Sequence, residues 1–410
     1  MLKLLHFADA HIDMANYGRH DPESGLPYRV MDYLKSLDTI VDAAIDEQVD
    51  LVLFAGDAYK DRNPAPTFQR EWGRRIMRLS NAGIPTILLV GNHDLSPGLG
   101  RAHALEEFAT LEVSNVFVAD RPTLYTPKEL GVDIQVLAVP WISRSGMMAF
   151  FDLRAADPSE VYAMLEEKIN ERIAAWMEDI DHDLPVVFTA HASVQGASYG
   201  GERTVMLGSD LVLSPSLVKN LKFDYVALGH IHKPQDLNED KQPPVVYPGS
   251  IERVDFGEAK DKKYYVLVEL EKGAAKVNWR ELTDIRNFID VFKRLDSDQN
   301  VTNEIRKVLP DAGKLEGAIV RLTLEYPREW ETAIDEAALR ELAATAFEFH
   351  FVKRPQMESR IRLPEDQAIG SLTETELLEI FWKSAHTEPA ERKQLLQMAG
   401  EIIEDVHTAE

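Results

Sequence analysis

Five short apolar runs in this sequence each end in residues that can bind a metal ion. The runs are Leu4–Ala8, Leu51–Ala55, Ile87–Val90, Val186–Ala190 and Val226–Leu228, and the residues that follow them are Asp9 and His11, then Asp57, then Asn92, His93 and Asp94, then His191, and finally His230 and His232. In open α/β sheets, ligands bind beyond the carboxyl ends of the strands, where the loops converge. Carboxylate, imidazole and amide-oxygen ligands suit Mn²⁺, Fe²⁺ or Zn²⁺. The sequence therefore predicts a metal site at one edge of a sheet.

Each of these residues has a plain structural interpretation when it is taken alone. An aspartate such as Asp57 after a strand is more often a turn former or a helix cap, and a single histidine such as His191 is more often structural. The segments GNHD and GHIH are more specific, because residues two apart in an extended segment point the same way and can reach neighbouring ions. All five segments in this order favour the metal site.

Two ions at this edge would need a shared ligand, since paired catalytic metals lie about 3.5–4 Å apart. Asp57 is the natural bridge, because it follows a central strand. Such a pair acidifies a bridging water to hydroxide, neutralises a phosphate and holds the nucleophile, phosphorus and leaving oxygen in line. The pattern points to phosphoester hydrolysis.

Composition limits the classes of protein that fit. The chain has 410 residues, which allows two or three domains of about 100–200 residues. Its 45 basic and 69 acidic residues give a net charge of −24, which argues against a protein that coats nucleic acid through many Lys and Arg contacts. An enzyme that meets phosphate through metal ions is not excluded. The chain has no cysteine, so disulfides, thiolate zinc sites and cysteine nucleophiles are excluded. It has neither a long apolar run nor a signal-like start, so we expect a cytoplasmic protein.

The first part of the chain alternates short β-rich runs with helical stretches, which predicts a layered α/β domain around a central sheet. Strands are expected at Leu2–Ala8, Asp50–Ala55, Ile84–Val90, Ile134–Val139, Pro185–Ala190, Asp224–Leu228, Val245–Tyr247 and Tyr264–Leu270, and helices at Arg29–Gln48, Thr67–Asn81 and Ser159–Asp179. After Leu282–Phe288 we expect a smaller α+β domain, with strands at Ala318–Glu325 and Phe347–Val352 and a helix at Thr332–Thr345.

The order DxH, GD, GNHD, H and GHxH resembles that of the calcineurin-like metallophosphoesterases. The segments LLHFADAHI, LVLFAGDAY, ALGHIHKPQ and VVYPGSIERVDFGE narrow the resemblance to SbcD-type repair nucleases, and it covers essentially the whole chain. The resemblance implies an α/β fold: a four-layer metallophosphoesterase sandwich of central β-sheets flanked by helices, with a small α+β capping domain and a C-terminal helical tail. The implied domains are residues 1–281 (nuclease), 282–365 (capping and DNA binding) and 366–410 (a helical segment that binds an ATPase).

The resemblance also implies roles for the site residues. One ion would be held by Asp9, His11, Asp57 and His232, and the other by Asp57, Asn92, His191 and His230. His93 would stabilise or protonate the leaving oxygen, and Asp94 would orient its imidazole. The expected cofactors are two Mn²⁺ ions, with Mg²⁺, Fe²⁺ or Zn²⁺ as alternatives. Arg62 lies in a loop that matches the family poorly and is left out of the site.

The function expected from the resemblance is that of a Mn²⁺-dependent DNA exonuclease and endonuclease in double-strand-break repair. Its partners would be DNA and an SbcC-type ATPase, with a homodimer of this chain inside a heterotetramer. Two other hypotheses stay open: a phosphoesterase acting on a small or protein-borne phosphate, and a scaffold whose metal site is dispensable. A second domain and a tail favour the nuclease over a small-substrate phosphatase.

Two further segments have a periodic pattern. Arg70, Arg74 and Arg78 form a basic stripe along one helix, which fits either a phosphate contact or a solvated or dimer-flanking face. Phe68, Trp72, Ile76 and Leu79 share that helix and suit either burial on the chain's own sheet or packing against a second copy. Near the C-terminus, Thr373 and Glu376 form a capping-box pattern. Two amphipathic helices follow it, with apolar positions at Leu377, Leu378, Phe381 and Trp382 and at Leu395, Met398, Ile402 and Val406.

Overall fold

The computed structural model describes residues 1–17, 19–95, 101–142, 158–200, 212–239, 241–356, 373–384 and 387–409. The chain divides into two compact units. The first comprises Met1–Asp290, Pro310–Arg321 and Ala343–His350, and the second comprises Val291–Leu309, Leu322–Leu342 and Phe351–Glu410. The predicted domain boundary after residue 281 stays a prediction. The boundary after residue 365 lies outside the described residues.

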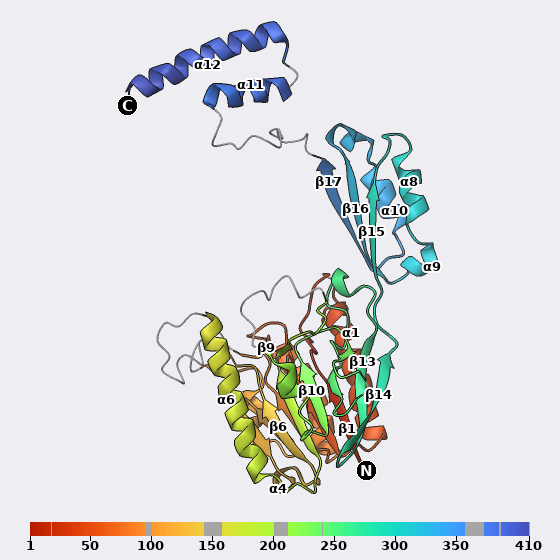
Figure 1. Cartoon of the computed structure of the whole chain (residues 1–410). Coiled ribbons are helices and arrows are strands. Elements are labelled where there is room, and N and C mark those ends of the chain that lie inside the picture. Colours follow the sequence, from red (N-terminus) through yellow and green to blue (C-terminus); the bar gives the residue numbers. More distant parts are fainter. Residues whose placement is uncertain are drawn as a thin grey trace. The chain divides into compact units, whose positions relative to one another are not determined.

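Two six-stranded sheets form the centre of the first unit (Figure 1). In spatial order the first sheet contains β14 (Ala274–Leu282), β13 (Lys263–Glu271), β1 (Leu2–Phe7), β2 (Leu51–Phe54), β3 (Thr86–Leu89) and β4 (Val116–Ala119). The second contains β11 (Gln235–Asp236), β12 (Val245–Tyr247), β10 (Tyr225–Gly229), β7 (Val186–His191), β6 (Gln135–Val139) and β5 (Thr123–Tyr125). Strands β1 to β4 run parallel, and so do β6, β7, β10 and β12. A small ribbon pairs β8 (Ser193–Val194) with β9 (Val212–Leu213).

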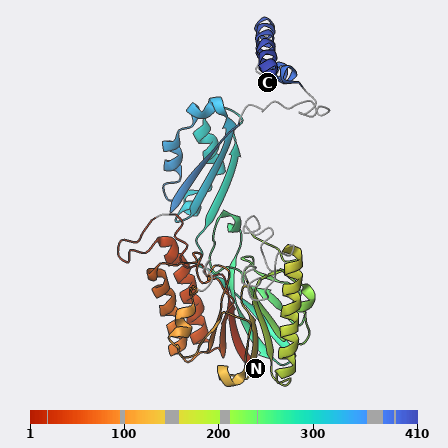
Figure 2. The same ribbon diagram turned by 90° about the vertical axis from the view of Figure 1, so that its left-hand side faces the viewer.

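Helices cover the outer faces of the two sheets. Figure 2 shows α1 (Tyr28–Asp46, red) and α2 (Pro66–Asn81, orange) on one side of the strands and α6 (Pro158–Asp179, yellow) on the other. The shorter helices are α3 (Glu106–Thr110), α4 (Pro127–Leu130), α7 (Pro215–Val218) and the 3₁₀ turn η2 (Phe256–Glu258). The four-layer sandwich is therefore confirmed.

The apolar runs read as strands because both faces of each strand are buried. In β1, Leu5 and Phe7 pack under the helices, while Leu4 and the following Ala8 pack between the two sheets. Strands covered on both sides read as continuous apolar runs. The parallel strands therefore end together, and each sheet delivers several loop residues to one edge.

The apolar side of α2 is part of the core. Trp72, Ile76 and Leu79 are buried in the cluster beneath the first sheet, and Phe68 packs against it. The interpretation of burial against the chain's own sheet is confirmed, so the buried Trp72, Ile76 and Leu79 are not available to a second copy.

The basic side of α2 is paired with carboxylates of the same chain. Arg70 and Arg74 both lie within 3.0 Å of Glu71, and Arg78 pairs with Asp38 and Asp42 on α1. Each guanidinium of the stripe thus has a carboxylate partner, although Glu71 is shared with Arg75 as well. The stripe is therefore only partly neutralised, and it is a weaker candidate for DNA contact than unpaired arginines would be.

A three-stranded sheet follows the large sheets. It is ordered β15 (Phe288–Arg294), β16 (Ile319–Pro327) and β17 (Glu348–Gln356), and the short helices α8 (Val301–Val308), α9 (Ala312–Leu315), η3 (Arg328–Ala333) and α10 (Glu336–Leu342) accompany it. The helix predicted at Thr332–Thr345 is present but shorter, because α10 covers Glu336–Leu342 and Thr332 belongs to η3. Helix α10 begins after Asp335, whose side chain accepts the Ala338 N–H at 3.0 Å, as an N-cap residue does.

The chain ends in α11 (Glu374–Ser384) and α12 (Pro389–Ala409). The predicted capping box is confirmed: the Glu376 carboxylate accepts the Thr373 N–H at 2.8 Å, and the Glu376 N–H reaches the Thr373 hydroxyl at 3.3 Å. The polar stretch predicted at Pro364–Ser371 and the side chain of Val406 lie outside the described residues. Among the helices that the structure describes, none is both long and apolar enough to cross a membrane.

A buried histidine lies between the two large sheets. His6 is fully buried on β1, with Nδ1 at 2.9 Å from the Tyr225 hydroxyl on β10. Burial lowers the pKa of His6 to about 3, below the ordinary value that it regains when the chain unfolds. Below about pH 6.5 the unfolded chain therefore takes up a proton that the folded chain refuses, and stability is lost as the pH falls.

We expect this histidine to contribute to acid sensitivity. Between pH 7 and pH 5 the wild-type protein should lose about 2 kcal/mol more unfolding free energy than His6→Gln. Urea unfolding at both pH values checks this, since the other histidines contribute equally to both proteins and cancel in the difference. Equal losses would show that the pKa of His6 is the same in the folded and the unfolded chain.

Candidate metal centre

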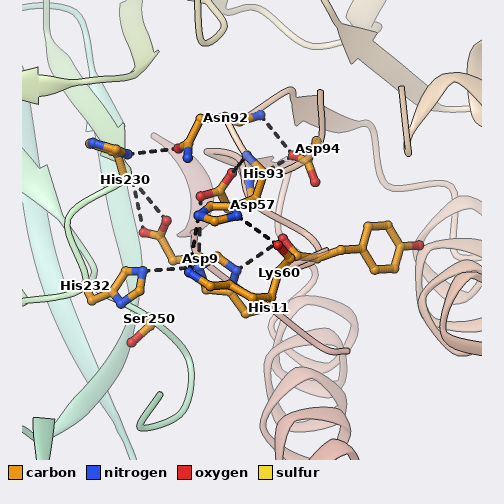
Figure 3. A network of polar contacts seen from close by, with 12 residues as sticks. Asp9, His11, Asp57, Lys60, Asn92, His93, Asp94, His230, His232 and Ser250 are labelled. Atoms are coloured by element: carbon orange, nitrogen blue, oxygen red, sulfur yellow. Dashed lines mark hydrogen bonds and ion pairs between the residues drawn. The ribbon is translucent and has the colours of Figure 1, made fainter. Parts of the chain in front are cut away.

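The predicted residues come together where the carboxyl ends of both large sheets meet (Figure 3). They form two clusters, Asp9 with His11 and His232, and Asp57 with His191 and His230. Within each cluster one ligand atom per residue lies within 4.8 Å of the others, and all six residues are buried. Asn92 joins the second cluster, with Oδ1 at 3.1 Å from both His191 Nε2 and His230 Nδ1.

The tautomers in the first cluster fit a cation. His11 Nδ1 lies 3.2 Å from the Tyr59 carbonyl and His232 Nδ1 lies 2.8 Å from the Glu258 carboxylate. Both partners can only accept, so each Nδ1 carries the proton and each Nε2 carries a lone pair. The two Nε2 atoms are 3.1 Å apart. Two lone pairs at this distance repel, and a shared cation removes the conflict.

The second cluster is also arranged to fit a cation. His191 Nδ1 donates to the Ala55 carbonyl at 2.7 Å, and Nε2 lies 3.3 Å from Asp57 Oδ2. Burial alone would lower the pKa of His191, but the Asp57 carboxylate raises it to about 9. The same attraction holds the pKa of Asp57 well below its usual range although burial opposes it. A metal ion here would take the place of the imidazole proton.

The backbone around the site is strained. Asp9, Asp57 and His230 have φ values of +50°, +63° and +99°, a region that costs non-glycine residues about 1–3 kcal/mol and persists only where the surroundings enforce it. Close packing also requires a glycine at position 91, because a Cβ there would lie 2.1 Å from Asp57 Oδ1. The loops are thus folded into one arrangement that presents the ligands.

Asp94 does not contact the His93 imidazole. Its carboxylate instead accepts the backbone N–H groups of Asp57, Ala58 and Gly91 at 2.9–3.0 Å. These bonds tie the loop after β3 to the loop after β2. The expectation that Asp94 orients the His93 imidazole is therefore wrong. Asp94 instead fixes the turn that carries Asp57.

The orienting partner of His93 is the main chain of Lys60. The Lys60 carbonyl lies 2.8 Å from His93 Nδ1, and the Lys60 ammonium lies 3.3 Å from Nε2. His93 belongs to neither cluster, but its ring meets His11 edge-on with centroids 5.2 Å apart. Nδ1 therefore carries a proton for the carbonyl, and Nε2 faces the Lys60 ammonium.

A cavity of about 490 Å³ opens beside His93. Its lining residues are Asp13, Met14, Ala15, Lys60, Asp61, Arg62 and His93. Asp13 accepts the Asp61 N–H at 2.9 Å and so holds the wall of the cavity. Arg62, which the sequence pattern did not place in the site, therefore lines the same cavity as His93.

Sequence reasoning missed three groups at the site. Lys60 follows Asp57 closely, yet only the fold shows that it contacts His93. Trp141 follows β6, and its ring lies 4.9 Å from that of His230. Glu258 contacts His232 from a distant segment. A tryptophan after a strand, on the same edge as the ligands, was the one signal available.

Comparisons with known proteins identify a family and several similar proteins. The model of the calcineurin-like phosphoesterase family matches residues 2–234. The chain is similar to the DNA double-strand break repair protein Mre11 of Archaeoglobus fulgidus, at 25% identity over 98% of this chain and 82% of that protein. It is similar to the SbcD component of the SbcCD nuclease of Staphylococcus saprophyticus, at 26% identity over 66% of each. A solved dimetal phosphatase from Danio rerio covers 68% of this chain and 96% of its own, at 11% identity and a TM-score of 0.39, which is too distant to bear on function. The family match and the two clusters support a dimetal centre.

Proposed function

The chain belongs to the calcineurin-like phosphoesterase family, and on this premise we propose that it is a Mn²⁺-dependent DNA exonuclease and endonuclease of the SbcD and Mre11 type, which acts in double-strand-break repair. The observation that carries the proposal is the double cluster of buried ligands beside His93. The similarity to a repair protein over nearly the whole chain favours DNA over a small phosphate as the substrate.

The ligands divide between two ions. Asp9, His11, Asp57 and His232 would hold one, and Asp57, Asn92, His191 and His230 would hold the other. When bound, the ions would supply a hydroxide at neutral pH and neutralise the phosphate. Soft thiolate ligands are absent and the donors are oxygen and imidazole nitrogen, which suits Mn²⁺ and leaves Mg²⁺, Fe²⁺ and Zn²⁺ as alternatives.

His93 is the proton donor in this proposal. The Lys60 carbonyl fixes Nδ1, so a protonated Nε2 would hand its proton to the oxygen that leaves phosphorus. The Lys60 ammonium at 3.3 Å adds positive charge at the same place. Asp94 keeps the Asp57 and Asn92 loops together through its three backbone bonds.

The net charge of −24 limits how the protein holds DNA. The α2 arginines are paired with acids, so affinity would come from the metal ions, from Lys60 and Arg62 at the cavity, and from a partner. We propose an SbcC-type ATPase as that partner and a homodimer of this chain within a heterotetramer.

The proposal is tested by incubating the purified protein with Mn²⁺ and end-labelled DNA, with and without an SbcC-type ATPase. Stepwise shortening of the DNA is expected, and it should stop when EDTA removes the metal. Hydrolysis of phosphate monoesters with no cleavage of DNA, even with the ATPase present, would instead support a small-substrate phosphoesterase.

The C-terminal helices would bind the ATPase. Phe381, Met398 and Ile402 are 50%, 58% and 62% exposed. A helix of 11 residues such as α11 is marginal unless its apolar face docks on something. Deleting Gly370–Glu410 should leave Mn²⁺-dependent cleavage of single-stranded DNA intact and abolish co-purification with the ATPase. Pull-down and nuclease assays on the same preparation check both results.

Point variants separate docking from truncation. Phe381→Glu and Ile402→Glu should each weaken the complex, whereas Gln397→Glu adds the same charge at an exposed polar position and should not. A truncated protein that binds the ATPase with unchanged affinity would rule out this role for the tail.

A further inference from the structure

Glu258 connects a ligand of the first cluster to a buried lysine. Its Oε1 accepts His232 Nδ1–H at 2.8 Å, and its Oε2 accepts the Lys263 ammonium at 2.6 Å. Glu258 is 2% exposed and Lys263 is fully buried. The same Oε2 also accepts the Val254 N–H at 3.0 Å and the Ser250 hydroxyl at 3.2 Å. The carboxylate is thus held in place from several directions.

This anchor differs from those of two other histidines of the site. His11 and His191 are held by the backbone carbonyls of Tyr59 and Ala55, which follow the end of β2. His232 lies in the loop after β10, and an acidic side chain holds its ring. That side chain is fixed in turn by Lys263 at the start of β13, a strand of the other large sheet.

A buried ion pair is weak evidence of a stabilising role. Removing two charges from water costs several kcal/mol per ion, and a well-packed apolar pair of similar volume is often as stable or more so. A carboxylate hydrogen-bonded to a metal-binding imidazole, in contrast, fixes its tautomer and ring orientation and raises its basicity as a ligand. The arrangement of Lys263, Glu258 and His232 matches this second use.

We propose that Glu258 is a positioning residue of the dimetal centre. With Lys263 it holds His232 in the Nδ1–H tautomer and presents Nε2 to the ion shared with Asp9 and His11. The chain of contacts ties the first large sheet to a ligand supplied by the second, so the first ion depends on how the two sheets are held together. This inference rests on the metal centre proposed above.

The test is a calorimetric titration of the purified protein with Mn²⁺ in the absence of DNA. Wild type should bind two ions. Glu258→Gln keeps the shape but removes the charge, and one binding event should weaken about 10–100-fold, as for other partners of metal-binding imidazoles. The other event should change by less than about threefold, since no ligand of the second cluster touches Glu258 among the contacts described.

Two further variants separate positioning from folding. Glu258→Gln combined with Lys263→Met removes both buried charges, so its thermal stability should recover while the weak metal site stays weak. Asp224→Asn is the matched control, because Asp224 is a buried carboxylate paired with Lys272 at 3.2 Å and precedes β10, at the strand end opposite the clusters. It should lose stability and keep both Mn²⁺ affinities.

The outcomes separate the positioning role of Glu258 from the existence of the metal centre. Two wild-type ions with unchanged affinities in both Glu258 variants would overturn the positioning role and leave the metal centre intact. Equal weakening in Asp224→Asn would also overturn it, by showing a general effect of instability. A wild-type protein that binds no Mn²⁺ would overturn the metal centre itself and this inference with it.

Discussion

The Asp57→Asn variant is expected to lose hydrolysis and to bind both metal ions weakly. The Asp57 carboxylate is almost fully buried. Its Oδ2 lies 3.3 Å from His191 Nε2 in one cluster and 3.9 Å from His11 Nε2 in the other, so a single side chain lies between the two clusters. Replacing it with an amide removes the shared negative charge, and the hydroxide nucleophile depends on the pair of ions.

The loss of Mn²⁺ affinity should exceed the roughly 10–100-fold that is typical of residues one shell further out. Calorimetry measures the affinities, and anomalous scattering from crystals soaked in Mn²⁺ measures occupancy. Asp50→Asn is a suitable control, because Asp50 precedes the same strand β2 at its opposite end and bonds the Lys3 N–H at 2.7 Å. Two fully occupied sites in Asp57→Asn would refute the bridging role.

The His93→Gln variant should keep its metal ions and lose about 10²–10⁴-fold in turnover, which is the usual contribution of a positioned acid or base. His93 lies outside both clusters. Its Nδ1 is engaged by the Lys60 carbonyl and its Nε2 by the Lys60 ammonium, so neither ring nitrogen is needed to hold a metal ligand in place. The measurement pairs kcat on DNA at saturating Mn²⁺ with the metal stoichiometry of the same sample.

The pH dependence adds a second readout for His93. Burial lowers the pKa of His93, the Asp57 carboxylate opposes this shift, and the Lys60 ammonium adds to it. Turnover by wild type should therefore fall on the alkaline side as His93 loses its proton, and His93→Gln should lack that limb. His103→Gln, which changes a partly buried histidine beside Asp120, should behave as wild type. If the metal content of His93→Gln falls instead, His93 is a ligand.

The sequence by itself determined the strands and the ligand residues that follow them. Strands such as β1 and β2 are short apolar runs buried on both faces, and that pattern is local. The residue after each run is therefore at a strand end whatever the rest of the chain does. The capping box of Thr373 and Glu376 is equally local, because its two residues contact each other across one helical turn.

Only the tertiary structure decided which side chains meet. The sequence pattern placed all the ligands on the edge of one sheet, whereas two sheets supply them. Which strands belong to which sheet is decided by pairing between strands that are far apart in the sequence. The partner of His93 is Lys60 and not Asp94, because the loop after β2 and the loop after β3 contact each other at the site. The arginines of the α2 stripe pair with Glu71 on the same helix and with Asp38 and Asp42 on α1. Contacts such as that of Glu258 with His232 depend on how segments far apart in the sequence pack. No periodic pattern in the sequence predicts which of these side chains will meet.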